Sequence, residues 1–238
     1  MSRLIEARGI SAGYGSGSAI RDIRLHVDAG EVVALLGPNG AGKTTTLLAL
    51  TGELPIREGE VTWLGKPARS PLHRRARHGM AYVSEGRSVF QRLTVKQNLA
   101  LARRGDPDKA MTIFPELREL HGRRGGLLSG GEQQMLTVAR ALTRPTRLFM
   151  ADELSLGLAP RTVGRLLSAV RAAADDGMGV LLVEQHVHRV LEIADRVYVL
   201  RQGAIQYTGP AQEARERIDE IRGMYLEASA GTAEPAAE

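Results

Sequence analysis

The pattern of hydrophobic and polar positions divides the chain into strand-like and helix-like segments. Residues Ile20 to Val27 alternate between apolar and polar side chains, which predicts a half-buried strand in an antiparallel edge region. Residues 31–36 (Glu-Val-Val-Ala-Leu-Leu) are almost continuously apolar, as in a strand that is buried on both faces. Similar apolar runs predict further strands at residues 80–83, 148–151, 179–184 and 196–200.

Helical signals lie between these runs. One segment has apolar residues at the spacing of a single helix face, at Val163, Leu166, Leu167 and Val170. Strand-like runs are absent between residues 85 and 145, where two capping boxes of the form S/T-x-x-E/Q begin at Thr94 and Ser129. A further helix is predicted from about Lys43 to Leu50. The chain therefore combines alternating strands and helices with one segment that is entirely helical.

Such alternation is typical of an α/β fold with a parallel core sheet. We predict one domain over residues 1–228, with a mixed or parallel core sheet, an N-terminal antiparallel β region and an all-helical subdomain at about residues 86–145. Residues 229–238 are small and acidic and lack periodicity, so we expect a disordered tail there. A chain of 238 residues with 43% apolar side chains can bury such a core without disulfides.

Composition excludes several classes of protein. The chain has no cysteine, which rules out disulfides, zinc–thiolate sites and cysteine nucleophiles. Its apolar runs are far shorter than the roughly 20 residues that a membrane-spanning helix needs. Glu6 interrupts the N-terminal segment where a secretory signal would continue its apolar core, so we do not expect export.

The formal net charge of +5 allows an acidic partner, either nucleic acid or an anionic membrane surface, and its sign does not decide between them. Basic residues cluster at residues 69–78, 103–104 and 123–124, without the interleaved aromatic side chains of a single-strand platform. We interpret these clusters as solvated faces, and we expect no nucleic-acid partner.

A glycine-rich loop connects the buried strand at residues 31–36 to the helix that begins near Lys43. Its glycines allow tight turns that point successive N–H groups at phosphate oxygens, and the helix adds the positive end of its dipole. Lys43 is expected to reach the β and γ phosphates, Thr44 to ligate Mg²⁺, and Thr45 to approach the α-phosphate. The predicted nucleotide-binding loop consists of Gly37, Pro38, Asn39, Gly40, Ala41, Gly42, Lys43, Thr44 and Thr45.

Two adjacent acids, Asp152 and Glu153, follow the apolar run at residues 148–151. Because the carboxyl ends of parallel strands present side chains to a ligand, we expect both acids near the phosphates. Asp152 is predicted to hold Mg²⁺ through water, and Glu153 to polarise the water that attacks the γ-phosphate. The alternative is a solvated acidic turn, since an Asp-Glu pair by itself is common.

Leu128-Ser129-Gly130-Gly131-Glu132 precedes these acids, and with the glycine-rich loop the ordered set resembles the ATP-binding-cassette (ABC) ATPases. The resemblance runs from about residue 14 to residue 203 and implies a P-loop NTPase fold of the ABC type, with ATP and Mg²⁺ as cofactors. It implies that Tyr14 stacks on adenine. It also implies that His186 contacts the γ-phosphate, so that Glu153, His186 and Lys43 are the catalytic residues. The alternatives are plain packing for Tyr14 and a solvated histidine for His186.

The same resemblance implies a dimer. In the family, the LSGG-type segment contacts the γ-phosphate held by a second subunit, so Ser129, Gly130, Gly131 and Glu132 are expected to contact the partner's ATP. The second subunit is either a copy of this chain or a different ABC ATPase. Residues 155–158 (Ser-Leu-Gly-Leu) match the loop that links the two sites.

The residues after the strand at 80–83 indicate a branch of the family. Glu85 stands where the family generally has a glutamine that touches Mg²⁺, and a carboxylate can serve as a metal ligand there. Residues 82–90, 93–95 and 184–186 resemble the branched-chain amino-acid importers. The resemblance implies an ATP-hydrolysing subunit on the cytoplasmic face of the cell membrane that powers uptake of branched-chain or related hydrophobic amino acids. Its partners would be two transmembrane permease subunits and an extracytoplasmic substrate-binding protein.

The helical segment and the loop from Arg87 to Leu93 are expected to receive the permeases. Val89, Phe90 and Leu93 could form an exposed apolar contact there, although a plain core role for them is the alternative.

Three other functions compete with import. A lipid or polysaccharide exporter also fits a short cassette, and Glu85 disfavours it. A soluble, non-transport ABC ATPase acting on ribosomes or DNA usually has two cassettes or a long coiled-coil insertion, which this length does not accommodate. A P-loop kinase or GTPase leaves residues 128–132 unexplained, and the chain has no NKxD-like guanine motif.

Overall fold

The buried run at residues 32–36 forms an inner strand of a six-stranded sheet. In the computed structural model, which describes residues 2–86, 88–102, 105–184 and 187–226, strand β3 (Val32–Leu36) pairs in parallel with β8 and β9. The strand order is β10-β9-β3-β8-β7-β6, and only the β9–β10 pair among these is antiparallel. The other five strands are β6 (Met80–Val83), β7 (Leu148–Asp152), β8 (Gly179–Glu184), β9 (Arg196–Arg201) and β10 (Ala204–Pro210).

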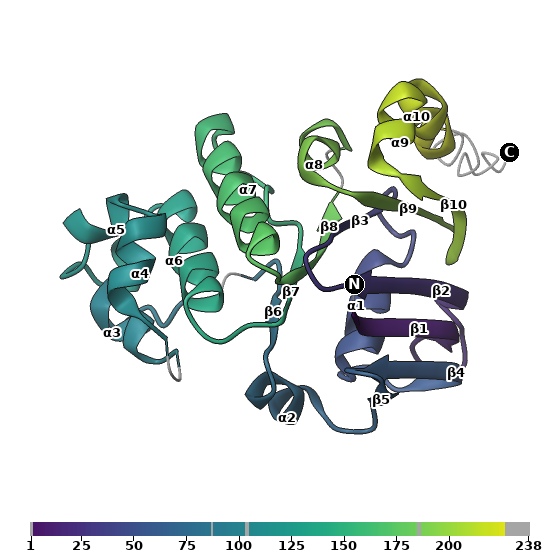
Figure 1. Ribbon diagram of the computed structural model, residues 1–238, viewed down its shortest axis with the longest axis horizontal. Coiled ribbons are helices and arrows are strands. Elements are labelled where there is room, and N and C mark those ends of the chain that lie inside the picture. The colour runs from purple at the N-terminus through teal and green to yellow at the C-terminus, as the bar shows by residue number, and fades with distance from the viewer. Residues whose placement is uncertain (1, 87, 103–104, 185–186, 227–238) are drawn as a thin grey trace, which may run out of the picture.

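A second, antiparallel sheet is built mostly from the N-terminal part of the chain. Its order is β2-β1-β4-β5, from β1 (Arg3–Ala12), β2 (Ile20–Asp28), β4 (Ile56–Trp63) and β5 (Lys66–Pro67). Helix α1 (Lys43–Thr51) packs against β1 and β2 and also against β7 of the first sheet (Figure 1). A shared apolar core therefore joins the two sheets around this helix.

The helices between β6 and β7 form a group on the far side of the core sheet from the antiparallel sheet (Figure 1). They are α3 (Val95–Ala100), α4 (Pro107–Ile113), α5 (Glu116–Glu119), the 3₁₀ turn η1 (Gly125–Leu127) and α6 (Gly130–Leu142). Both predicted capping boxes are confirmed, at Thr94 for α3 and at Ser129 for α6. Helix α6 packs against the other three α-helices of the group and against α7 (Pro160–Asp175).

The remaining helices are α2 (Leu72–Arg77), α8 (Val187–Ile193), α9 (Ala211–Glu216) and α10 (Ile218–Leu226). Val163, Leu166, Leu167 and Val170 of α7 are all buried, as their helical spacing predicts. The predicted fold class is confirmed: the chain has a mixed core sheet, an antiparallel sheet and a group of helices. The predicted disordered tail, residues 229–238, lies outside the described residues.

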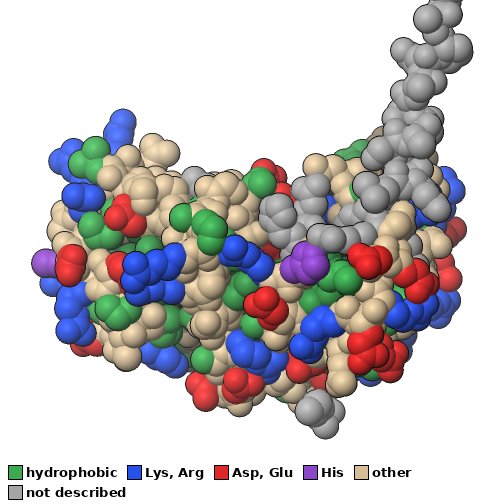
Figure 2. All heavy atoms as spheres, turned by 90° about the horizontal axis from the view of Figure 1, so that it is seen from above, with side chains coloured by type: hydrophobic (Ala, Val, Ile, Leu, Met, Phe, Trp, Pro, Cys, Tyr) green, Lys and Arg blue, Asp and Glu red, His purple; other side chains and the backbone are tan. Residues whose placement is uncertain are grey.

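The lengths of the helices and the distribution of surface charge bear on two of the expectations from the sequence. Among the described residues, no helix is both long enough and apolar enough to span a bilayer. Over the face drawn in Figure 2, charged side chains of both signs are interspersed with apolar ones rather than gathered by kind.

One residue of the basic cluster at 69–78 contradicts its interpretation as a solvated face. Arg75 lies in α2 and is only 3% exposed. Its guanidinium donates to the carbonyl oxygens of Ser70 at 2.6 Å and Leu50 at 2.6 Å, and also to that of Ala68. Arg75 thus joins the C-terminal end of α1 to the segment before α2. The prediction was wrong because the cluster contains a short helix, α2, whose buried face places the Arg75 guanidinium against three backbone carbonyls from outside the helix.

Replacing Arg75 with methionine is expected to lower the free energy of unfolding by about 3 kcal/mol, because several buried carbonyls lose a charged donor. Denaturant unfolding of the two proteins measures the difference. Arg74→Met is the matched control, since Arg74 is exposed on the same helix, and its effect is expected within about 0.5 kcal/mol. Equal effects of the two substitutions would contradict the structural role of Arg75.

Candidate phosphate-binding site

The glycine-rich loop leaves the carboxyl end of β3 and enters α1 directly. Gly42 is the N-cap of α1 and has a φ of 104°, a conformation that favours glycine. A Cβ on Gly37 would lie 2.3 Å from the carbonyl oxygen of Leu200 in β9, so only glycine fits there as well. No side chain caps the N-terminus of α1, and its N–H groups are therefore available to an anion.

The side chain of Lys43 binds to the backbone of this loop. It is buried, and its Nζ donates to the carbonyl oxygen of Gly37 at 2.8 Å and to that of Pro38 at 3.1 Å. Burial lowers the pKa of Lys43, while the nearby carboxylates of Glu153, Asp152 and Glu184 act in the opposite direction. The ammonium group thus lies beside the loop, among acids that favour its charged form.

Asp152 ends β7 beside this loop. It is 3% exposed, and its Oδ1 has no hydrogen-bond partner among the described residues. Burial raises the pKa of Asp152, and a hydrogen bond with the side chain of Thr44 offsets part of that effect. Thr44 is exposed on the first turn of α1, whereas Thr45 is buried. An unpartnered buried carboxylate oxygen beside a threonine hydroxyl is a donor set that suits a hard cation.

Glu153 lies at a sharp turn after the strand. Its φ of 49° is left-handed, which costs roughly 1–3 kcal/mol for a residue other than glycine. The turn is fixed by a bond from the N–H of Glu153 to the carbonyl oxygen of Val183 at 2.9 Å, and Leu154 is buried in the core. The half-buried carboxylate of Glu153 therefore projects from a backbone that the neighbouring strand β8 holds in place.

Glu184, the last residue of β8, is a site residue that sequence reasoning missed. It is 1% exposed, and its two oxygens accept hydrogen bonds from Ser155, at 3.0 Å from the backbone N and at 2.7 Å from Oγ. Burial, with smaller contributions from Glu153 and Asp152, raises the pKa of Glu184 to about 7 even though the bonds from Ser155 lower it. The only sequence signal is an acid that ends a fully apolar strand, three residues after Leu181.

Tyr14 and Glu85 lie in exposed segments. Tyr14, in the loop between β1 and β2, is 59% exposed, and that loop is held by Arg57, which donates to the carbonyl oxygens of Gly15 and Ser16. Glu85 follows β6 and is exposed, and its charge raises the pKa of Asp152 slightly. Glu85 is therefore within electrostatic range of the phosphate site, and the ring of Tyr14 is accessible to a ligand.

The LSGGE segment forms the start of α6. Ser129 is exposed and caps the helix, with the N–H of Glu132 donating to its Oγ at 3.3 Å. The Glu132 carboxylate in turn accepts from the N–H of Ser129 at 2.7 Å. Gly131 lies close to Thr162 at the start of α7, where a Cβ would meet its side chain at 3.2 Å. The segment belongs to the helical group rather than to the elements that pack on α1.

Predicted site residue His186, with Gln185 and Arg87, lies outside the described residues. Among the predicted residues that are described, Lys43, Asp152 and Glu153 are brought together at one end of the core sheet. The carboxylates beside this lysine supply oxygen ligands for a divalent cation, and the lysine supplies positive charge for a polyphosphate.

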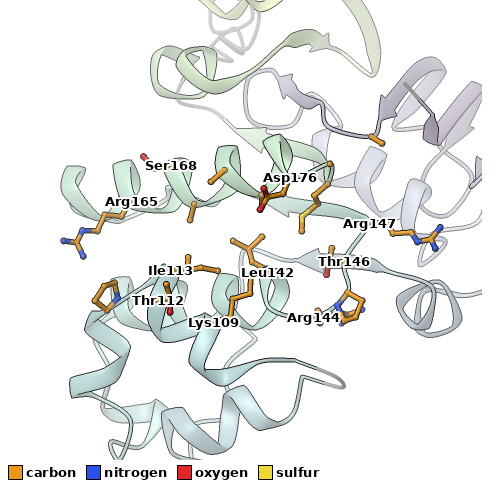
Figure 3. Close-up of a pocket in the computed structure, with 18 of the residues that line it drawn as sticks. Lys109, Thr112, Ile113, Leu142, Arg144, Thr146, Arg147, Arg165, Ser168 and Asp176 are labelled. Atoms are coloured by element: carbon orange, nitrogen blue, oxygen red, sulfur yellow. The ribbon is translucent and has the colours of Figure 1, made fainter.

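A separate groove of 1210 Å³ lies between α7 and the helical group (Figure 3). Ile113 and Leu142 line it from the helical group, and Ser168 lines it from α7. Arg147 and Met178, which precede β7 and β8, also line it. The groove is therefore at the amino ends of these strands, the opposite end of the sheet from the phosphate loop.

Comparison with known proteins places these features in one family. A sequence-family profile described as ABC transporter matches residues 20–155. The high-affinity branched-chain amino acid transport ATP-binding protein BraG of Pseudomonas aeruginosa is 40% identical over 228 residues, which cover 91% of this chain and 97% of BraG. The probable branched-chain amino acid transport ATP-binding protein LivF of Archaeoglobus fulgidus is 36% identical, over 87% of this chain and 92% of LivF.

Two other similarities are informative. The lipopolysaccharide export system ATP-binding protein LptB of Escherichia coli strain K12 is 32% identical, over 93% of this chain and 96% of LptB. A solved structure of the ATP binding subunit of an ABC transporter superposes with a TM-score of 0.78 at 26% identity, over 94% of this chain and 97% of that one. Fold and sequence thus agree along nearly the whole chain.

Proposed function

Because the chain belongs to the ABC transporter family, whose ATP-binding cassettes hydrolyse ATP to power transport, we propose that it drives an importer of branched-chain or related hydrophobic amino acids. The proposal rests on the sequence identity between this chain and its relatives. The two named for branched-chain amino acid transport are 40% and 36% identical, against 32% for LptB. Glu85 supports the same branch.

The chemistry that we assign to the site is attack of water on the γ-phosphate. The N–H groups of Asn39, Gly40 and Gly42 and the Lys43 ammonium bind the phosphates, and the exposed ring of Tyr14 stacks on adenine. Glu153 accepts a proton from the attacking water while the oxygen of that water bonds to the γ-phosphorus. The bond between the γ-phosphorus and the leaving oxygen of ADP breaks in the same reaction. The products are ADP and inorganic phosphate. His186 is the remaining candidate for a γ-phosphate contact.

Mg²⁺ fits the residues present. The buried, unpartnered Oδ1 of Asp152 and the exposed hydroxyl of Thr44 are hard oxygen donors, and Glu85 is close enough to contribute charge. When bound, the ion would neutralise charge on the β and γ phosphates. We therefore assign Asp152 and Thr44 as ligands of Mg²⁺, with Glu85 as a further ligand.

The partners follow from the family. ABC ATPases work as dimers with transmembrane permease partners. For this chain we propose a head-to-tail dimer in which residues 129–132 of one subunit contact the ATP of the other, at the cytoplasmic face of the membrane. The position of Ser129 supports this dimer, because Ser129 is exposed at the start of a 13-residue helix. The positive end of the helix dipole at that point favours an anion such as phosphate.

The loop before α3 is the proposed contact with the permeases. Phe90 is 55% exposed, whereas Val89 packs against the core and Leu93 is half-buried, so the three residues do not form one exposed patch. The fully buried Asn98 holds the loop: its Oδ1 accepts from the N–H of Phe90 at 2.9 Å, and its Nδ2 donates to the carbonyl oxygens of Phe90 and Leu93. A fixed loop that presents one aromatic ring is suited to a permease pocket.

Reconstitution tests the transport class. The chain and its cognate permeases in proteoliposomes are expected to hydrolyse ATP about tenfold faster when a substrate-binding protein loaded with leucine, isoleucine or valine is enclosed, a typical coupling of about 1.4 kcal/mol. Phe90→Ala is expected to keep the basal rate and lose the stimulation. Stimulation by lipopolysaccharide, without any need for a binding protein, would instead support the export function suggested by the LptB relatives.

A further inference from the structure

Glu184 and Ser155 form a buried contact between two loops of the site. Strands β7 and β8 run in parallel with Asp152 opposite Val183, so the residues that follow Asp152 pass beside the end of β8. Glu184 accepts hydrogen bonds from both the N–H and the Oγ–H of Ser155, which lies 29 positions earlier in the sequence. Both carboxylate oxygens are therefore engaged by the segment that carries Glu153.

The contact between Ser155 and Glu184 helps to hold the strained turn at Glu153 in place. Glu153 has a left-handed φ of 49°, and such a conformation persists only where the surroundings over-determine it. The N–H of Glu153 is bound to Val183, Leu154 is buried, and Ser155 is bound to Glu184. Removing the last attachment leaves the turn of Glu153 held only by the bond to Val183 and by the burial of Leu154.

We infer that Glu184 is a positioning residue for ATP hydrolysis, which fixes the turn of Glu153 through its two hydrogen bonds to Ser155. The inference rests on the proposed role of Glu153. Glu184 acts through geometry and not as a second base, because it is only 1% exposed to water and both of its oxygens accept hydrogen bonds from Ser155. A side chain that preserves both bonds is then sufficient, whatever its charge.

The test compares two replacements of Glu184 in the full-length protein. Glutamine can accept from the N–H of Ser155 and donate to its Oγ, so Glu184→Gln is expected to keep kcat within about threefold. Glu184→Leu keeps the buried volume and removes both bonds. It is expected to lower kcat by about 10- to 10²-fold, the scale of a small misplacement of a catalytic group, with KM for MgATP within about twofold. Ser155→Ala, which removes one bond, is expected to be intermediate.

Glu31→Gln is the matched control for loss of a buried, hydrogen-bonded glutamate. Glu31 precedes β3 at the opposite end of the sheet, where it accepts from the N–H of Asp28 at 3.0 Å and from Nε of Arg196 at 2.8 Å. Its substitution is expected to lower the melting temperature and to leave kcat within about twofold. Binding of a fluorescent ATP analogue to every variant verifies that the nucleotide site is folded.

Three outcomes would overturn the inference. If Glu184→Gln is as inactive as Glu184→Leu, the charge is required and Glu184 takes part in the chemistry. If Glu184→Leu retains kcat, or raises only KM, the contact does not position Glu153. Failure of the proposed function is distinguishable, because it appears as an inactive wild-type protein or as an active Glu153→Gln variant.

Discussion

Replacing Glu153 with glutamine is expected to lower ATP turnover by about 10²- to 10⁴-fold, the usual contribution of a general base, while ATP binding is retained. The amide has the same shape as the carboxylate, so it fits the turn that Val183 fixes, but it cannot accept the proton of the attacking water. The phosphate-binding groups, Lys43 and the N–H groups of the loop, are unchanged. The substitution thus separates binding from chemistry.

Phosphate release and binding of a fluorescent ATP analogue measure the two properties for Glu153→Gln. Glu192→Gln is a suitable control, because Glu192 is an exposed acid on α8 and its loss is expected to leave both properties unchanged. Undiminished hydrolysis in Glu153→Gln would remove Glu153 from the mechanism.

Replacing Ser129 with alanine is expected to lower hydrolysis by about 10²-fold, the effect of losing one preorganised donor to a phosphate, without weakening ATP binding to a monomer. The substitution also removes a helix cap, which costs about 1 kcal/mol of stability. Thr94→Ala is a matched control, since Thr94 caps α3 with the same capping box. It is expected to lower stability equally and to leave the rate unchanged.

Mixing two inactive variants tests whether Ser129 serves the partner's ATP. In a mixed dimer of Ser129→Ala and Lys43→Ala, one site combines an intact loop with an intact LSGGE segment, and the other site carries both lesions. Activity is therefore expected to reappear on mixing. If Ser129 served its own phosphate loop, both sites would be defective and the mixture would stay inactive.

Much of the fold follows from local pattern. The phosphate loop lies between β3 and α1, as the apolar run and the glycines predict, and both capping boxes are present because they depend on residues only three positions apart. The proximity of Asp152 to Lys43 also follows, since Asp152 ends β7 and the loop that leads to Lys43 leaves the carboxyl end of β3 in the same sheet.

What the sequence did not reveal depends on contacts between distant segments. The bonds from Ser155 to Glu184 require the register of β7 against β8, and no local pattern encodes that register. The burial of Arg75 likewise depends on the carbonyl of Leu50, which is 25 residues away. In both cases a charged residue that is usually exposed finds its partner only once the chain has folded.

Helix α6 connects the LSGGE segment to the loop that presents Phe90. Ser129 caps its N-terminus, and near its other end the guanidinium of Arg140 lies 5.6 Å from the centre of the Phe90 ring and donates to the carbonyl oxygen of Ser88 at 2.5 Å. At 1.5 Å per residue its 13 residues span about 20 Å, so Ser129 and Arg140 lie near opposite ends of one continuous helix. In the proposed assembly, a displacement of Phe90 by the permease would reach Ser129 through this one helix, which would couple the permease to enclosure of the partner's ATP.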